Sequence, residues 1–155
     1  MMNKRVWLSI IAACVVVGTI AAAQAVGRSS SSSHGSSKQS HRVVFDVSME
    51  GAERWDGVLN NVENLRHAFG ERNTEVEVVV HGKALPLLQR TNTAMSERMR
   101  DLSEKGVTFA ACENTMRRMN VTREMLLPFA VTVDAGVAEL VRKQEAGWAY
   151  IKAGG

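Results

Sequence analysis

From residue 43 onward, the apolar positions follow two patterns that predict two kinds of element. Nearly continuous apolar runs, rich in β-branched residues, predict strands that are buried on both faces. There are five such runs, at Val43–Val47, Val76–Val80, Val107–Ala111, Ala130–Val133 and Trp148–Ile151. Between them, apolar residues at helical spacing predict longer helices. These stripes lie at Trp55–Phe69, Met95–Leu102 and Val137–Val141.

Shorter helical segments are predicted at 85–88, 116–119 and 122–127, and Asp134 is placed to cap the last helix. Strands that are separated by helices are joined by right-handed crossovers, which make neighbouring strands parallel. The sequence therefore predicts an α/β fold, a three-layer α/β/α sandwich with a parallel sheet of about five strands.

The first 41 residues have a different character and divide the chain into three parts. Met1–Arg5 is short and basic, residues 6–23 form an apolar run, and Ala23-Gln24-Ala25 is a small-x-small motif; this combination is typical of a secretory signal that is cleaved after Ala25. Residues 29–40 hold eight serines and no apolar side chain, so they cannot bury enough surface to offset their chain entropy. We therefore predict a signal peptide over 1–25, a Ser-rich flexible tether over 26–41 and a folded domain over 42–155.

Two other interpretations of the N-terminal segment stay open. The apolar run is nearly long enough to span a bilayer, so an uncleaved N-terminal anchor is the second choice. The motif Ile11-Ala12-Ala13-Cys14 resembles the lipobox of bacterial lipoproteins, which would place a lipid on Cys14. All three interpretations put the domain outside the cytoplasm. We expect an exported, periplasmic protein, with membrane contact only through this segment if it is not cleaved.

The formal net charge of +3 belongs to the N-terminal part of the chain. From residue 43 onward there are 14 basic and 16 acidic side chains, so the folded part is slightly acidic. A domain with this charge does not capture nucleic acid electrostatically. We therefore expect no nucleic-acid partner.

The usual motifs of nucleotide, zinc-protease and dithiol sites are absent from the sequence: there is no P-loop lysine pattern, no GxGxxG, no HExxH and no CxxC. His34 and His41, in and beside the tether, would make a poor metal site because a flexible chain does not hold two ligands in a fixed geometry. We expect neither a cofactor nor a bound metal.

Reactive groups in parallel sheets collect beyond the carboxyl ends of the strands. There the sequence places His81-Gly82 after the second predicted strand and Cys112 after the third. Once residues 1–25 are removed, Cys112 is the only cysteine. Because it stands where a strand runs into a predicted helix, free N–H groups would favour its thiolate. Burial as a small apolar side chain is the competing interpretation, and His81 could either assist the thiol or only bond a neighbouring loop.

Three stretches of the sequence resemble one known family. They are VVVHGKALPLL, GVTFAACENTMRRMNV and AGVAELVRKQEAGWAYIK, which are similar to the DsrE/DsrF-like family, in particular its small stand-alone branch. The resemblance covers about residues 42–152. It implies a five-stranded parallel sheet between helices and assembly into dimers, trimers or hexamers.

The resemblance also implies roles for individual residues. In sulfur-relay members of the family, a cysteine after the third strand accepts sulfur as a persulfide and passes it to another protein, and Cys112 occupies that position. His81, followed by Gly82, matches a histidine that is common in the branch, and Asn114 and Thr115 follow the cysteine as in the branch pattern. These five residues are the candidate site.

Two functions of different classes follow from these observations. The first is an exported sulfur carrier or sulfurtransferase-like protein with a persulfide on Cys112 and a protein as sulfur donor or acceptor. The alternative is a non-catalytic oligomeric module that binds a small anion or a partner protein at the strand-end cleft, which Cys112 only lines. The sequence does not decide whether the protein is an enzyme. In both cases we expect at least a homodimer.

Overall fold

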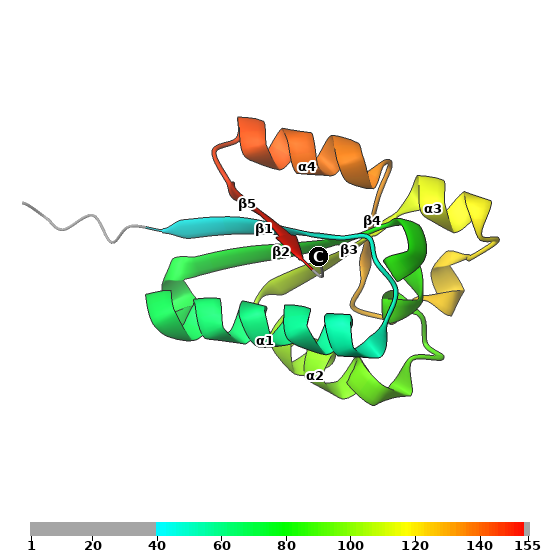
Figure 1. Cartoon of the computed structure of the whole chain (residues 1–155), viewed down its shortest axis with the longest axis horizontal. Helices are drawn as coiled ribbons and strands as arrows, with labels where there is room; N and C mark the ends of the chain where they lie inside the picture. The colour runs from blue at the N-terminus through cyan, green and yellow to red at the C-terminus, as the bar shows by residue number, and fades with distance from the viewer. Residues whose placement is uncertain (1–39, 154–155) are drawn as a thin grey trace, which may run out of the picture. The chain divides into compact units, whose positions relative to one another are not determined.

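The computed structural model describes residues 40–153, at whose centre lies a sheet of five parallel strands (Figure 1). The predicted signal peptide and nearly all of the predicted tether lie outside these residues. All five predicted strands are present: β1 (His41–Val47), β2 (Thr74–Val80), β3 (Val107–Cys112), β4 (Val131–Val133) and β5 (Ala149–Ala153). Their order across the sheet is β4-β3-β2-β1-β5.

Helices cover both faces of this sheet, which confirms the predicted α/β/α sandwich (Figure 1). Helices α1 (Ala52–Phe69) and α2 (Thr93–Glu104) pack on one face. Helix α4 (Gly136–Glu145) packs on the other. Helix α3 (Glu113–Arg118) directly follows β3, beyond the carboxyl end of that strand.

Three short 3-10 helices complete the described residues. They are η1 (Glu71–Asn73), η2 (Gly82–Leu88) and η3 (Arg123–Met125). The second contains the predicted turn at 85–88 and buries Leu85, Leu87 and Leu88. Within residues 40–153, no helix has both the length and the apolar character needed to cross a membrane.

Two apolar clusters hold the layers together. The larger lies between the sheet and α1 and α2, and its fully buried side chains include Phe45, Leu59, Met99 and Phe109. The smaller lies under α4 and consists of Val44, Val79, Ala110 and Leu140. Because hydrophobic stabilisation scales with the apolar area removed from water, the larger cluster contributes most of it.

A buried ion pair also fastens α4 to the sheet. Lys143 of α4 places its Nζ 2.5 Å from Oε2 of Glu77 in β2 and 4.1 Å from the ring centroid of Trp148. Burial raises the pKa of Glu77, against the lowering effect of Lys143. Loss of Lys143 alone would leave a buried carboxylate without its partner, which is the costly way to break such a pair.

The prediction that Asp134 caps the last helix is wrong. Helix α4 begins at Gly136, its N-cap is Ala135, and no side chain caps it. The Asp134 carboxylate instead accepts a hydrogen bond of 2.5 Å from the guanidinium of Arg142, about two helical turns along the chain. The first turn of α4 is therefore free of a capping side chain, and it faces the site described below.

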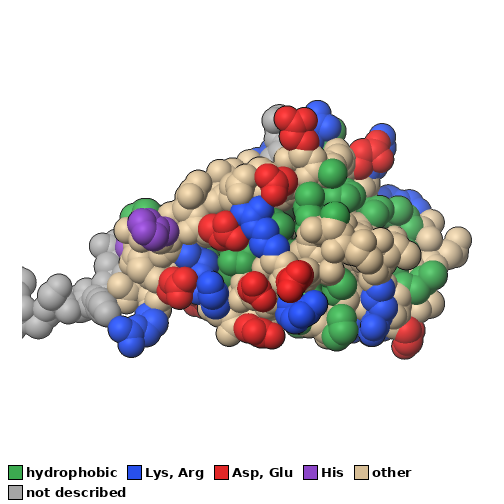
Figure 2. All heavy atoms as spheres, turned by 90° about the horizontal axis from the view of Figure 1, so that it is seen from below, with side chains coloured by type: hydrophobic (Ala, Val, Ile, Leu, Met, Phe, Trp, Pro, Cys, Tyr) green, Lys and Arg blue, Asp and Glu red, His purple; other side chains and the backbone are tan. Residues whose placement is uncertain are grey.

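Figure 2 shows the face that α1 and α2 form, where acidic and basic side chains are interspersed. Arg98 of α2 joins the two helices there, because its guanidinium lies 2.8 Å from Asp56 and 2.6 Å from Glu63 of α1. Exposed pairs of this kind contribute little individually. The bidentate contact with Glu63 nevertheless fixes how the two helices lie against each other.

Candidate functional site

Side chains from three adjacent strands meet at the carboxyl ends of the sheet, on the side that α4 covers. Asp46 stands near the end of β1, His81 directly follows β2, and Cys112 is the last residue of β3. Each is two positions beyond a strand residue of the cluster under α4, namely Val44, Val79 and Ala110. Since side chains along a strand alternate between faces, all three lie on the α4 side.

The sulfur of Cys112 is buried, yet it is surrounded by hydrogen-bond donors. The residue is 5% exposed and stands at the N-cap of α3. Burial raises the pKa of the thiol, but the Thr115 hydroxyl and the backbone N–H groups of Gly136, Thr115 and Asn114 together outweigh burial, so the pKa lies below its ordinary value. The cysteine is thus buried, and its surroundings favour the anion.

Thr115 is held in the orientation that serves this sulfur. Its Oγ1 accepts a hydrogen bond of 3.0 Å from the backbone N–H of Gly82. A hydroxyl that accepts at its oxygen still has one hydrogen to donate, and here the Cys112 sulfur is the acceptor. Gly82 itself has a φ of +58°, a conformation that glycine adopts at no steric cost. Gly82, the second residue after β2, is thus connected to Cys112 through the Thr115 hydroxyl.

Gly136 brings the first turn of α4 against the same sulfur. A Cβ atom on this residue would lie 3.1 Å from Cβ of His81 and 3.3 Å from Cβ of Cys112. A Cβ at these distances would force its neighbours to shift by a few tenths of an ångström, so the missing Cβ lets the backbone N–H of Gly136 approach the sulfur. The close approach also places His81 and Cys112 on either side of one residue.

His81 is bonded to a carboxylate behind it. Its Nε2 lies 2.7 Å from Oδ1 of Asp46, a residue near the end of β1 that is 6% exposed. The other oxygen of Asp46, Oδ2, accepts a hydrogen bond of 2.7 Å from the Tyr150 hydroxyl and lies 3.4 Å from Nζ of Lys152. Both of these partners come from β5, which pairs with β1.

This network keeps the Asp46 carboxylate ionised at neutral pH. The hydrogen bond from His81 is the largest effect, and with the bond from Tyr150 it outweighs burial and lowers the pKa of Asp46 to about 2. The hydrogen bond to Asp46 correspondingly raises the pKa of Tyr150 to about 12. The Cys112 site therefore has a permanent negative charge on the far side of the His81 ring.

The model of the DsrE/DsrF-like family matches residues 41–153, which is almost all that the structure describes. The chain belongs to the DsrE/DsrF-like family. The resemblance inferred from three stretches of sequence is thereby confirmed. No curated protein matched the chain in a sequence search.

Solved structures share the fold of this DsrE/DsrF-like chain. A protein of unknown function from Methanobacterium thermoautotrophicum, MTH1491, is 33% identical, covers 72% of this chain and 98% of its own, and superposes with a TM-score of 0.69. A conserved protein of unknown function from Bacteroides thetaiotaomicron, BT1422, is 12% identical over 72% of this chain and 93% of its own, with a TM-score of 0.59. The ychN protein of Escherichia coli is 14% identical over 74% of this chain and 98% of its own, also with a TM-score of 0.59. The last two support the fold alone.

The structure places four of the five candidate residues of this family member close together, three of them joined by hydrogen bonds. Cys112, Thr115 and Gly82 form the hydrogen-bonded chain described above, and His81 lies beside Cys112. Asn114 contributes its backbone N–H to the sulfur, whereas its side chain is exposed and accepts a hydrogen bond from Arg117. Asn114 therefore contributes to the site through its backbone and not through its side chain.

Sequence reasoning missed three residues of the site: Asp46, Gly136 and Tyr150. A signal existed for Asp46, because a carboxylate inside an otherwise apolar strand that is covered on both faces must have a partner. A signal existed for Gly136 too, because glycine at the first position of a helix has low helix propensity and calls for a packing reason. Tyr150 gave none, since an aromatic residue in a strand is common.

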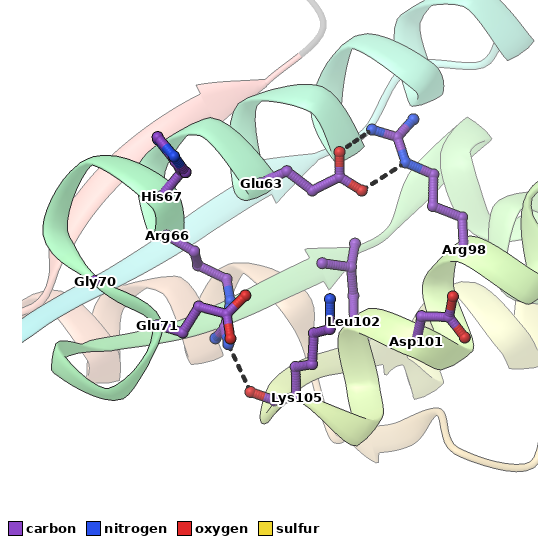
Figure 3. Close-up of a pocket in the computed structure, with 9 residues that line it drawn as sticks. All are labelled: Glu63, Arg66, His67, Gly70, Glu71, Arg98, Asp101, Leu102 and Lys105. Carbon is purple, nitrogen blue, oxygen red and sulfur yellow. Dashed lines mark hydrogen bonds and ion pairs between the residues drawn. The ribbon is translucent and has the colours of Figure 1, made fainter.

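A cavity lies toward the opposite end of the strands of this DsrE/DsrF-like domain (Figure 3). It has a volume of about 390 Å³ and is lined by polar side chains of α1 and α2. The buried guanidinium of Arg66 reaches under it to donate to the backbone carbonyl of Lys105 at 2.7 Å, which ties α1 to the turn before β3. Glu63 and Arg98 form an ion pair of 2.6 Å at its edge. The cavity lining contains no cysteine.

Among residues 40–153, no three histidine, cysteine or carboxylate side chains come close enough to hold a metal ion. The chemistry that this family member offers in its described part is that of an anion-stabilised thiol with a carboxylate-bonded histidine beside it.

Proposed function

We propose that this protein is a sulfur carrier in which Cys112 bears a persulfide. The observation that carries the proposal is the set of donors around the Cys112 sulfur: one hydroxyl and three backbone N–H groups lower its pKa although the residue is buried. A thiolate is the nucleophilic form of cysteine, and a persulfide is a stronger acid than a thiol. The same donors therefore stabilise the anionic form of Cys112 both as a thiolate, before loading, and as a persulfide, after loading. Membership of the DsrE/DsrF-like family agrees with this chemistry.

Loading of Cys112 balances without an external oxidant. The Cys112 thiolate attacks the terminal sulfur of a donor persulfide, R–S–SH. A new S–S bond forms at Cys112, the S–S bond of the donor breaks, and R–S⁻ leaves with the electron pair of the broken bond. Unloading to an acceptor thiolate is the same step in reverse. With thiosulfate as donor, the thiolate attacks its outer sulfur and sulfite is the leaving group.

The burial of Cys112 restricts which donors can react. At 5% exposure, the sulfur is reached only by a donor whose terminal sulfur is unhindered, such as a small inorganic sulfur species or a persulfide at the tip of a partner protein's loop. This restriction also protects a loaded persulfide from oxidation, to which an exposed sulfur in an oxidising compartment would be prone.

We further propose that the protein works as a homo-oligomer through its α4 side. Four large apolar side chains are exposed there: Val131, Val137, Val141 and Tyr150. Val137 and Val141 are one turn apart on α4 and are 64% and 48% exposed. A single helix covers this face of the sheet, and a second copy would cover what α4 leaves open.

Export to the periplasm, with cleavage after Ala25, remains part of the proposal. Its support is the order of basic, apolar and small-x-small segments in residues 1–25. N-terminal sequencing of the protein recovered from the periplasm should begin at Val26. Recovery of intact Met1 in the membrane fraction would favour the anchor instead, and lipid on Cys14 would favour the lipoprotein.

Mass spectrometry of the peptide that carries Cys112 tests the sulfur-carrier proposal. After incubation of the full chain with thiosulfate or a low-molecular-weight persulfide, the peptide should gain the mass of one sulfur atom, and reduction should remove it. Cys112→Ser should abolish the gain, whereas Cys14→Ser, which changes the other thiol of the chain, should not.

The absence of any sulfur on Cys112 under these conditions would leave the alternative, a binding module in which the same donors hold a small anion. In that case Cys112→Ser should keep the binding, because the donors come from Thr115 and the backbone rather than from the cysteine.

A further inference from the structure

One oxygen of the Asp46 carboxylate is devoted to His81. Oδ2 serves the two donors from β5, Tyr150 and Lys152, whereas the hydrogen bond at Oδ1 comes from Nε2 of His81 at 2.7 Å. A carboxylate that only connected β5 to β1 would need the hydrogen bonds from Tyr150 and Lys152 alone. A buried carboxylate is costly unless it is fully hydrogen-bonded, so its position between β5 and the histidine calls for a reason beyond strand pairing.

The ionised state of Asp46 determines which nitrogen of His81 carries the proton. Asp46 has a pKa of about 2, so at neutral pH its oxygens only accept hydrogen bonds. Nε2 of His81 must then be the donor. In the neutral imidazole the other nitrogen, Nδ1, has no hydrogen and offers a lone pair. The tautomer thus follows from the chemistry of the partner.

His81 and Cys112 lie against the same residue, Gly136. Cγ of His81, the ring atom that bears Nδ1, lies 3.3 Å from the point where a Cβ of Gly136 would stand, and Cβ of Cys112 lies 3.3 Å from that point too. Nε2 is occupied by Asp46 on the β1 side of the ring. Nδ1 is therefore the ring nitrogen that Asp46 leaves free, on a side chain that packs with Cys112 around Gly136.

We propose that Asp46 is a positioning residue that holds His81 in the Nε2–H tautomer and so makes Nδ1 the proton acceptor for Cys112. This inference rests on the sulfur-carrier function proposed above. The Cys112 thiol gives its proton to Nδ1, the thiolate attacks R–S–SH, and the leaving R–S⁻ takes the proton back from the imidazolium. The products are Cys112–S–SH and R–SH, so one proton is moved and returned and no oxidant is consumed.

Asp46 acts in the intermediate state of this cycle. When His81 is an imidazolium, its Nε2–H bond to the carboxylate becomes charge-assisted and stronger. The thiolate and the imidazolium then form together, with one carboxylate behind the ring. The other charged groups near the three side chains are compensated by partners of their own. These are Lys152 at Asp46, the Lys83–Glu50 pair after His81, the Glu113–Arg117 pair after Cys112 and the Asp134–Arg142 pair before α4.

The pH profile of Cys112 alkylation separates this role from a structural one. The rate with iodoacetamide is measured from about pH 5 to about pH 9, where histidine and thiol groups titrate. The full chain is compared with Asp46→Asn, His81→Gln and the double variant, and the Cys112 peptide is scored by mass spectrometry because Cys14 is a second thiol. Lys152→Gln is the matched control, since Lys152 contacts the same carboxylate but not the histidine.

In Asp46→Asn the imidazolium of His81 loses its charged partner. We therefore expect the midpoint of the Cys112 alkylation profile to move up by about one pH unit, and the alkylation rate near pH 6 to fall about tenfold. His81→Gln should give the same shift, and the double variant should add nothing further, because Asp46 acts through His81. Lys152→Gln should keep the midpoint of the original chain. An unchanged midpoint in a folded Asp46→Asn protein, or shifts that add in the double variant, would overturn the assignment.

A second measurement needs no variant. Nitrogen-15 NMR of the unsubstituted protein distinguishes the two histidine tautomers, and His81 should carry its proton on Nε2 at neutral pH; a proton on Nδ1 would overturn the assignment. Sulfur loading is scored separately. A chain that shows the Asp46-dependent profile but never carries sulfur refutes the sulfur-carrier function alone, whereas normal loading with an Asp46-independent profile refutes the positioning role alone.

Discussion

The backbone N–H of Gly82 donates a hydrogen bond of 3.0 Å to Oγ1 of Thr115, and this contact joins the end of β2 to the helix that follows β3. It directs the single hydrogen of the Thr115 hydroxyl to the sulfur of Cys112. A side chain that is itself not a nucleophile thus links the histidine-glycine motif to the cysteine.

Thr115→Val removes this hydroxyl at nearly constant volume. Hydrogen bonds to charged groups are worth about 1.5–3 kcal/mol, so the pKa of Cys112 should rise by about one unit or more. Alkylation of Cys112 by iodoacetamide near pH 7, scored by mass spectrometry of the Cys112 peptide, should slow about tenfold. Thr115→Ser keeps the hydroxyl and should stay close to the original rate. Equal rates in the valine and serine variants would show that the hydroxyl does not support the thiolate.

Gly136→Ala should harm the site although alanine is the better helix former. The added Cβ would stand 3.1 Å from His81 and 3.3 Å from Cys112, so the first turn of α4 or the two strand ends must shift by a few tenths of an ångström, which weakens the contact between its N–H and the sulfur. We expect a loss of about 1–3 kcal/mol in unfolding free energy together with slower alkylation. Gly57→Ala is the matched control in α1, where a Cβ meets nothing within 4 Å; it should stabilise by up to about 1 kcal/mol. Denaturant unfolding of both variants checks the opposite signs.

The titration of Tyr150 can be read without interference, because it is the only tyrosine of the chain. Its hydrogen bond to Asp46 raises its pKa to about 12. The tyrosinate absorbance should therefore appear near pH 12 in the folded protein, and Asp46→Asn should bring the midpoint down toward 10, the ordinary value. Circular dichroism at each pH ensures that the folded state is observed. A midpoint near 10 in the original chain would show that this hydrogen bond is not made.

Asp46 should also make stability depend on acid. Its pKa is lowered from 3.8 to about 2 in the folded state, chiefly by the hydrogen bond from His81. A depressed carboxyl pKa stabilises the fold above the unfolded pKa, and that stabilisation is lost as the pH falls through the folded pKa. Between about pH 4 and about pH 2 the chain should lose on the order of 2 kcal/mol through this group. Denaturant midpoints across the interval should fall more steeply for the original chain than for Asp46→Asn.

Charge on the exposed side of α4 should prevent the proposed assembly. Val137→Asp and Val141→Asp place a carboxylate on the apolar face of a helix that is otherwise well packed through Leu140. Sedimentation analysis at tens of micromolar should give at least a dimer for the original chain and a monomer for these variants. Ala94→Asp adds the same charge to an exposed position of α2, on the other face of the sheet, and should leave the assembly intact. A monomeric original chain would refute the proposed oligomer.

The sequence predicted the fold well, for reasons that are local. Val76–Val80 and Val107–Ala111 are β-branched or apolar runs, and this composition predicts strands that are buried on both faces. The location of the site followed from a topological rule, because parallel strands present their carboxyl ends at one edge. Cys112 and His81 could be placed there as soon as their strands were recognised.

The inner structure of the site could not be predicted in the same way. Three of the four donors around Cys112 are backbone N–H groups, which every residue but proline carries and which leave no mark on the sequence. Gly136 and Asp46 reach the site through tertiary contacts with segments far away in the chain, and no local pattern reports such contacts. Asn114, too, joins the site through its backbone N–H at the helix start.

The pairing of β5 with β1 determines when this site is completed during synthesis of the chain. Tyr150 and Asp46 are 104 positions apart, and Asp46 receives both of its Oδ2 partners from β5. A chain still emerging from a ribosome or a translocation pore exposes Asp46, His81 and Cys112 well before residues 150–152 are delivered. Until then the carboxylate lacks two of its three donors and β1 lacks its outer neighbour. The cysteine thus reaches its final environment only after almost the whole domain has been released.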